Sequence, residues 1–139
     1  SGTALACEAD APTLKIRPVE PKNFDDVSRS LKAGKILSNP APSGSICDAI
    51  ITPAPGTMTF PHLHRLCGQG LVLPDEDCLR AMSLAFTRLK LALEPGGAIA
   101  LAAALFHGDQ IEGGDVICVA SGGNVEAKMF TKALTEYPV

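Results

Sequence analysis

The segment Asp115–Ala120 (DVICVA), followed directly by Ser121–Asn124 (SGGN), decides the fold class of this 139-residue chain. A continuous apolar run of this length is typical of a strand buried inside a parallel sheet. The glycines after it lead into a helical pattern over Val125–Leu134. Shorter extended segments, Leu14–Val19 and Gly70–Leu73, also alternate with helical patterns. Strands that alternate with helices predict an α/β fold with three layers, in which a mostly parallel sheet is flanked by helices.

The segments before residue 70 are mainly helical or irregular. Ser1–Glu8 looks like the end of a helix, and Pro61 opens a short helix that Gly68 ends. Asn23 is the expected cap of a helix over Phe24–Ala33, which Gly34 closes. Residues 35–59 hold four prolines and two glycines, and they predict a long irregular crossing with a helical turn at Cys47–Ile51.

The longest helix is expected to begin at Pro74-Asp75 and to carry one apolar stripe. The stripe consists of Leu79, Met82, Phe86, Leu89 and Leu93. Glu94–Gly97 (EPGG) breaks this helix. The next one, Ala98–Phe106, is apolar on every side, and we expect it to be buried all round.

The composition is that of a soluble globular domain or a part of one, with 46% apolar and 19% charged residues. The net charge of −3, the scattered basic residues and the absence of Trp argue against a nucleic-acid partner. The longest apolar run, Ala98–Phe106, is far shorter than the ~20 residues of a membrane-spanning helix. No secretory signal pattern is visible. These features predict a cytoplasmic protein with no membrane partner.

The cysteines number five, without a C-x-x-C pair, which argues against a disulfide framework, a zinc knuckle and a dithiol redox motif. They are Cys7, Cys47, Cys67, Cys78 and Cys118. We interpret them as small buried hydrophobic residues in a reducing cytosol. The alternative is a catalytic thiol of low pKa, for which Cys67 is three residues after His64 and could lie on the same helical face.

Three groups of residues could carry chemistry. Ser121–Asn124 is expected at the carboxyl end of a strand and the amino end of a helix, where open α/β sheets bind ligands; the alternative is a tight turn. Glu20 and Asp26 are expected near each other with backbone carbonyls between them, and oxygen ligands suit Mg²⁺ or Ca²⁺. The alternative is that Asp25 and Asp26 are solvated partners of the helix dipole. Glu94, at a helix break, is either half-buried with a function or exposed at the end of its helix.

A set of short motifs follows one another along the chain: Val19-Glu20-Pro21, Asp25-Asp26, Leu31–Gly34, Ser45–Asp48, Thr59–Pro61, Arg88–Leu91, Glu94–Ala98 and Ser121–Val125. In this order they resemble the C-terminal part of the serine/threonine dehydratase family. These are the fold-type II pyridoxal-phosphate enzymes that include serine racemase. The resemblance extends from Ser1 to about Phe130 and implies that the chain is part of a fold-type II large domain.

The resemblance implies two binding sites. Ser121 is similar to the serine that hydrogen-bonds the pyridine nitrogen of pyridoxal 5'-phosphate, with Gly122, Asn124 and Glu94 also near the cofactor. Glu20, Asp26 and the carbonyl of Phe24 match the site for a divalent cation (Mg²⁺, Mn²⁺ or Ca²⁺) of some members. Asp48-Ala49 departs from the common Asp-Gly, which puts in doubt a substrate contact by that backbone.

In the family, the lysine that forms the Schiff base and the glycine-rich phosphate loop belong to the N-terminal part. Lys15-Ile16-Arg17 echoes the lysine motif but leads to Glu20-Pro21, so no residue of 1–139 is assigned as catalytic. The implied function is β-elimination of water from serine or threonine to a 2-oxo acid and ammonia, with the isolated chain inactive. The implied partners are a small amino-acid substrate and either a second copy (a dimer) or a separate N-terminal half. The alternative is a non-catalytic cation- or ligand-binding domain or a truncated fragment.

Overall fold

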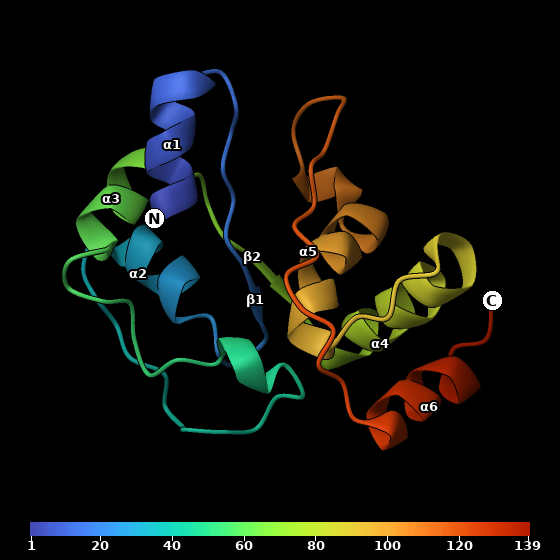
Figure 1. The fold of residues 1–139 in the computed structure, drawn as a ribbon. Coiled ribbons are helices and arrows are strands. Elements are labelled where there is room, and N and C mark those ends of the chain that lie inside the picture. Colours follow the sequence, from blue (N-terminus) through green and yellow to red (C-terminus); the bar gives the residue numbers. More distant parts are fainter.

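Two short parallel strands form the sheet in the computed structural model, which describes all of residues 1–139. β1 (Val19–Pro21) pairs with β2 (Leu71–Leu73), with Val19 opposite Leu71 and Pro21 opposite Leu73. A parallel bridge between Ile16 and Cys67 extends the pairing. Helices α1 to α3 lie on one side of the strands and α4 to α6 on the other (Figure 1). The predicted α/β class, with a parallel sheet between helices, is confirmed.

The helices follow the predicted order with boundaries shifted by a few residues. They are α1 (Gly2–Asp10), α2 (Asp26–Ala33), α3 (Phe60–Leu66), α4 (Asp75–Leu84), α5 (Pro95–Phe106) and α6 (Ala127–Glu136). Shorter turns are η1 (Asp48–Ile50), the π-helical turn η2 (Ala85–Leu89) and η3 (Gly108–Gln110). None of these helices has the length and apolar character needed to cross a membrane.

The main core lies where α4 and α5 pack against each other and against the strands. Leu73 of β2 and Met82 of α4 are almost fully buried beside Ala98 and Ala102 of α5. Small alanine side chains on α5 let its backbone approach α4 closely. This packing holds the first turn of α5 in a fixed position beneath the loop that precedes α6.

The prediction that Asp115–Ala120 is a buried strand is wrong. This segment makes no strand pairing, and Val116, Ile117 and Val119 are 49%, 79% and 64% exposed. A strand needs a neighbour whose N–H and C=O groups complete its hydrogen bonds. The chain places no strand beside this segment, so the sheet has two strands rather than three.

The apolar stripe of the longest helix is only partly buried, which corrects a second prediction. Leu79, Met82 and Leu93 are buried, but Phe86 and Leu89 are 39% and 58% exposed. Phe86 and Leu89 lie within the π-helical turn η2, which departs from the 3.6-residue period and takes both side chains off the buried stripe. α5 is likewise not buried all round, because Leu105 on its outer face is exposed.

The start of α2 differs from the prediction as well. Asn23 is not its cap: its backbone lies in the left-handed region (φ 72°), and Asp25 is the residue that precedes the helix. The carboxylate of Glu20 instead accepts hydrogen bonds from the backbone N–H groups of Val27 and Ser28, at 2.9 and 2.7 Å. These are donors that a helix leaves without internal partners at its N-terminus.

Candidate functional site

The first turn of α5 and the loop Ser121–Asn124 form the first candidate site. Glu94 precedes α5, and its carbonyl accepts the N–H of Ala98 at 3.0 Å. Its own N–H donates to the carbonyl of Gly122 at 3.1 Å. This bond ties the loop to the N-terminus of α5, where the aligned peptide dipoles leave a partial positive charge.

Three glycines permit this contact. A Cβ on Gly97 would lie 2.8 Å from the backbone nitrogen of Gly122 and closer still to its carbonyl oxygen. A Cβ on Gly122 would overlap the carboxylate of Glu94, and one on Gly123 would lie 2.5 Å from the carbonyl oxygen of Ala92. Glycine is therefore needed here for close approach of two backbones.

Of the four residues predicted to bind the cofactor, Glu94 and Gly122 meet at this contact, and Ser121 and Asn124 flank it on the same loop. Glu94 is half-buried and touches Gly122, whereas Ser121 and Asn124 are exposed on the same loop. The side chains of Ser121 and Asn124 make no hydrogen bond within the chain, so their polar groups are free for a ligand. The loop follows an extended segment rather than a strand, and it faces the start of α5 while α6 begins only at Ala127.

Glu20 and Asp26 form the second candidate site, at the end of β1 and the start of α2. Asp26 is 1% exposed, so the alternative reading of Asp26 as a solvated residue is wrong. Its Oδ1 accepts a hydrogen bond from Asn39 at 2.7 Å, while its Oδ2 is buried without a partner. The carbonyl of Phe24, in the turn between the two carboxylates, accepts no backbone hydrogen bond.

Burial acts on both carboxyls of this second site. It raises the pKa of Glu20, and the nearby charge of Asp26 raises it further, against the hydrogen bonds from Val27 and Ser28. Burial also raises the pKa of Asp26. Two buried carboxylates, an unpartnered oxygen and a free carbonyl are the kind of oxygen donors that a hard divalent cation takes.

Asn39 holds Asp26 in place, and sequence reasoning missed it. Its Nδ2 donates to Asp26 and also to the carbonyl of Thr52, both at 2.7 Å. Its Oδ1 accepts a hydrogen bond from Arg29 at 2.6 Å. Asn39 lies in the irregular crossing 35–59, where neither periodicity nor a motif indicates which residues make structural hydrogen bonds.

The cysteine and lysine residues give no nucleophile at either site. Cys67 lies just beyond α3, and burial raises the pKa of its thiol, opposite to what a catalytic thiolate requires. Every lysine is exposed. These are Lys15, Lys22, Lys32, Lys35, Lys90, Lys128 and Lys132.

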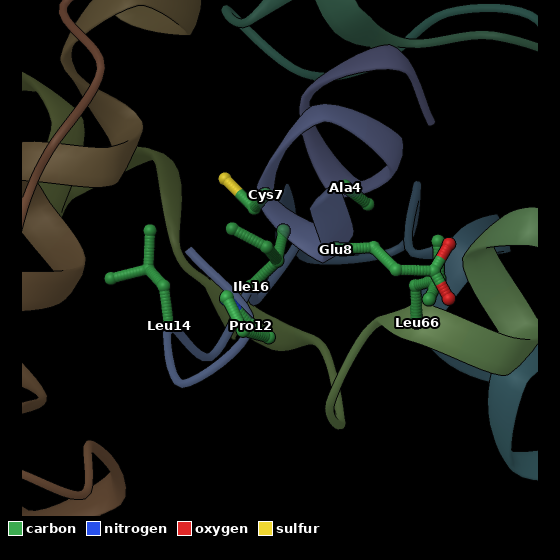
Figure 2. Close-up of a pocket in the computed structure, with 7 residues that line it drawn as sticks. All are labelled: Ala4, Cys7, Glu8, Pro12, Leu14, Ile16 and Leu66. Carbon is green, nitrogen blue, oxygen red and sulfur yellow. The ribbon is translucent and has the colours of Figure 1, made fainter. Parts of the chain in front are cut away.

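A separate pocket of about 280 Å³ lies between α1, the segment 12–16 and α3 (Figure 2). Seven residues line it: Ala4, Cys7, Glu8, Pro12, Leu14, Ile16 and Leu66. Its charged residue, Glu8, forms an ion pair with Arg65 of α3. Five of the seven lining residues are hydrophobic, and none of the predicted site residues borders the pocket.

Comparison with known proteins agrees with the fold and with the family that the sequence resembles. The family model of pyridoxal-phosphate dependent enzymes matches residues 1–122. Serine racemase from Oryza sativa subsp. indica is 36% identical over 96% of this chain and 40% of its own length. L-threo-3-hydroxyaspartate ammonia-lyase from Pseudomonas sp is 32% identical over 96% of this chain and 42% of its own length.

Solved structures show the same likeness. A T.th. threonine deaminase superposes with a TM-score of 0.85 at 40% identity, over 90% of this chain and 42% of that one. Maize serine racemase gives a TM-score of 0.85 at 34% identity, over 97% of this chain and 42% of that one. The chain thus spans about two fifths of the length of these relatives. It belongs to the pyridoxal-phosphate dependent enzymes and has the fold of their fold-type II members.

Proposed function

We propose that this chain is the C-terminal part of a pyridoxal-phosphate dependent enzyme that eliminates water from a small hydroxy-amino acid, giving a 2-oxo acid and ammonia. The observation that carries the proposal is the contact between Glu94 and the loop Ser121–Asn124, which three glycines make possible. Relatives named for serine, threonine and hydroxyaspartate, all of them hydroxy-amino acids, support the substrate class.

The residues present fit the pyridine end of the cofactor. The hydroxyl of Ser121 is free to meet the ring nitrogen, Asn124 offers a free amide, and the absence of a side chain on Gly122 lets the carboxylate of Glu94 lie against the loop. When bound, the cofactor supplies the electron sink for the elimination. The work of this chain is to orient the ring and to donate a hydrogen bond from Ser121 without protonating the nitrogen. A carboxylate at that position would instead favour the protonated ring.

The proposal is tested by placing the N-terminal part of a relative, such as maize serine racemase, before residues 1–139 in one polypeptide. We expect this joined chain to bind pyridoxal phosphate and to release 2-oxo acid from serine or threonine. A folded joined chain that binds the cofactor but releases no 2-oxo acid from any hydroxy-amino acid would overturn the proposal.

The 139-residue chain alone is expected to form no 2-oxo acid. None of its lysines lies in a Schiff-base context, and all of them are exposed. The measurement is 2-oxo acid formation by the purified chain with the cofactor and either serine or threonine. As a second readout, the chain is incubated with the cofactor, any Schiff base is reduced with borohydride, and the protein mass is measured. Complete conversion of the chain to a form that carries one cofactor on a single lysine would contradict this expectation.

We also propose that Glu20, Asp26 and the carbonyl of Phe24 bind a divalent cation at the junction of β1 and α2. Binding to the native state alone raises stability by about 2.7 kcal/mol when the cation is at 100 times its Kd. Millimolar Mg²⁺, Mn²⁺ or Ca²⁺ is therefore expected to raise the Tm by several degrees. The Asp26→Asn variant is expected to lose this shift, because it removes the charge and offers an N–H to the cation.

The matched control for the cation is Asp109→Asn, an exposed aspartate in η3 without an ion pair. Its Tm shift with cation should equal that of the unsubstituted chain. Asn39→Ala should give a smaller shift, because Asp26 loses the hydrogen bond that orients it. Equal shifts in Asp26→Asn and Asp109→Asn would rule out this site.

A further inference from the structure

Two cysteines that lie 31 positions apart in the chain meet in the interior. The Sγ atoms of Cys47, just before η1, and Cys78, in α4, are 3.6 Å apart, and both residues are fully buried. They form a small apolar cluster with Ile99 of α5. This contact is separate from both candidate sites, and neither site uses either thiol.

Hydrogen bonds to Asp75, at the start of α4, hold the Cys47 backbone in this position. The carboxylate of Asp75 accepts the hydroxyl of Ser45 at 2.6 Å and the N–H of Ile46 at 3.0 Å. The Ser45 hydroxyl oxygen in turn accepts the N–H of Cys47 at 3.0 Å. Because Cys78 lies one helical turn after Asp75, these bonds present Cys47 to Cys78 in a set orientation.

We propose that Cys47 and Cys78 are a dithiol site that a low-molecular-weight disulfide oxidises to a buried cross-link. One thiolate attacks a sulfur of the small disulfide and releases one small thiol. The second cysteine then attacks the mixed disulfide and releases the other. Two electrons pass from the protein to the small disulfide, and the two cysteine protons end on the two small thiols.

The reaction is expected to be slow, since it needs local opening. The hydrogen bond between the two thiols, together with burial, raises the pKa of the Cys78 thiol, so the closed native state holds it protonated. The thiolate is the attacking species. The oxidant therefore reacts only when the segment around Ser45 and Ile46 leaves Asp75, and the pair recloses as a cross-link.

The cross-link would also restrict the motion of the turn that packs against α5 at the first candidate site. Ala49 and Ile50, which follow Cys47, lie against Gly96 in the first turn of α5; a Cβ on Gly96 would lie 3.5 Å from the side chain of Ile50. Joining Cys47 to α4 would fix this turn against α5. The pair thus lies behind the helix end that contacts Ser121–Asn124.

The experiment equilibrates the folded chain with oxidised glutathione, then denatures it, alkylates the remaining thiols and maps the peptides by mass. We expect one peptide pair, joined through Cys47 and Cys78 and lighter by two hydrogen atoms. The other cysteines should be recovered as alkylated thiols or as mixed disulfides. Because the cross-link restricts the unfolded chain, we expect the Tm to rise by about 10 °C.

Two variants make the result specific. Cys47→Ala should lose both the joined peptide and the oxidant-dependent rise in Tm, whereas Cys67→Ala should keep both. Since an alanine at a buried position can lower stability by itself, each variant is compared with its own reduced form. Recovery of Cys47 and Cys78 as free thiols after prolonged oxidation would overturn the proposal, as would a cross-link to any other cysteine.

Discussion

Replacing Gly97 by alanine is expected to lower the free energy of unfolding by about 1–3 kcal/mol, the range for a side chain forced into a filled interior. The new Cβ would meet the backbone nitrogen and carbonyl of Gly122, and neither group can rotate away as a side-chain tip can. The loop Ser121–Asn124 must move off α5, which breaks the hydrogen bond between Glu94 and Gly122. Chemical denaturation of the 139-residue chain measures the loss.

Gly96→Ala is the matched control for this effect, since Gly96 is the preceding residue of the same helical turn. A Cβ there would make ordinary contact with Ile50, 3.5 Å away, and with Ala49, 3.8 Å away. Alanine in a helix is favoured over glycine by up to about 1 kcal/mol, so this variant should be as stable as the unsubstituted chain or more so. Equal changes in the free energy of unfolding of the two variants would mean that the loop Ser121–Asn124 is not in close contact with Gly97 of α5.

Replacing Ser121 by alanine is expected to lower turnover by about one to two orders of magnitude in the joined polypeptide that carries the N-terminal part of a relative. The variant leaves the ring nitrogen of the cofactor without its hydrogen-bond donor, at a cost of about 1–3 kcal/mol. Where that cost falls on the transition state, each 1.36 kcal/mol is about tenfold in rate. The side chain of Ser121 makes no hydrogen bond within the chain, so stability should change little.

Ser121→Thr keeps the hydroxyl and should restore most of the turnover, which a purely structural role would not predict. Turnover per folded molecule, cofactor affinity and the free energy of unfolding are measured on the same preparations. If Ser121→Ala lowered stability but left turnover unchanged at full cofactor occupancy, Ser121 would only shape the turn, and its assignment to the cofactor would be wrong.

Motifs made of neighbouring residues were predicted well. The sequence predicts a helix break at Glu94–Gly97 and a loop at Ser121–Asn124, because glycine and proline at adjacent positions restrict the backbone in few ways. The loop is present, but the break lies at residues 90–94, and Pro95–Gly97 form the first turn of α5. The proximity of Glu94 to this loop is implied by the resemblance to the family and not by any local pattern. It rests on the packing of α5 against α4 and the strands, and no local pattern encodes a contact between Gly97 and Gly122.

At the second site, too, the features that depend on nearby residues were predictable, and those that depend on distant segments were not. Glu20 and Asp26 were identified as a pair, since a strand end and a helix start only a few residues apart must lie near each other. The burial of Asp26 and its bond to Asn39 depend on the crossing 35–59, whose path local propensity does not define. The strand prediction for Asp115–Ala120 failed for a related reason: its apolar residues predicted a sheet environment, and no neighbouring strand in this chain provides one.

By itself, then, the sequence determined the α/β class, the order of the helices and the family. The class and the helix order follow from local periodicity and turn residues, and the family follows from short motifs, whereas the roles of the site residues are what the resemblance to that family implies. Only the tertiary structure decided which thiols meet, which glycines must stay glycine and which carboxylate oxygen is left without a partner. Those features arise from contacts between segments that lie far apart in the chain or between backbones in direct contact, where packing, rather than any local preference, selects the arrangement.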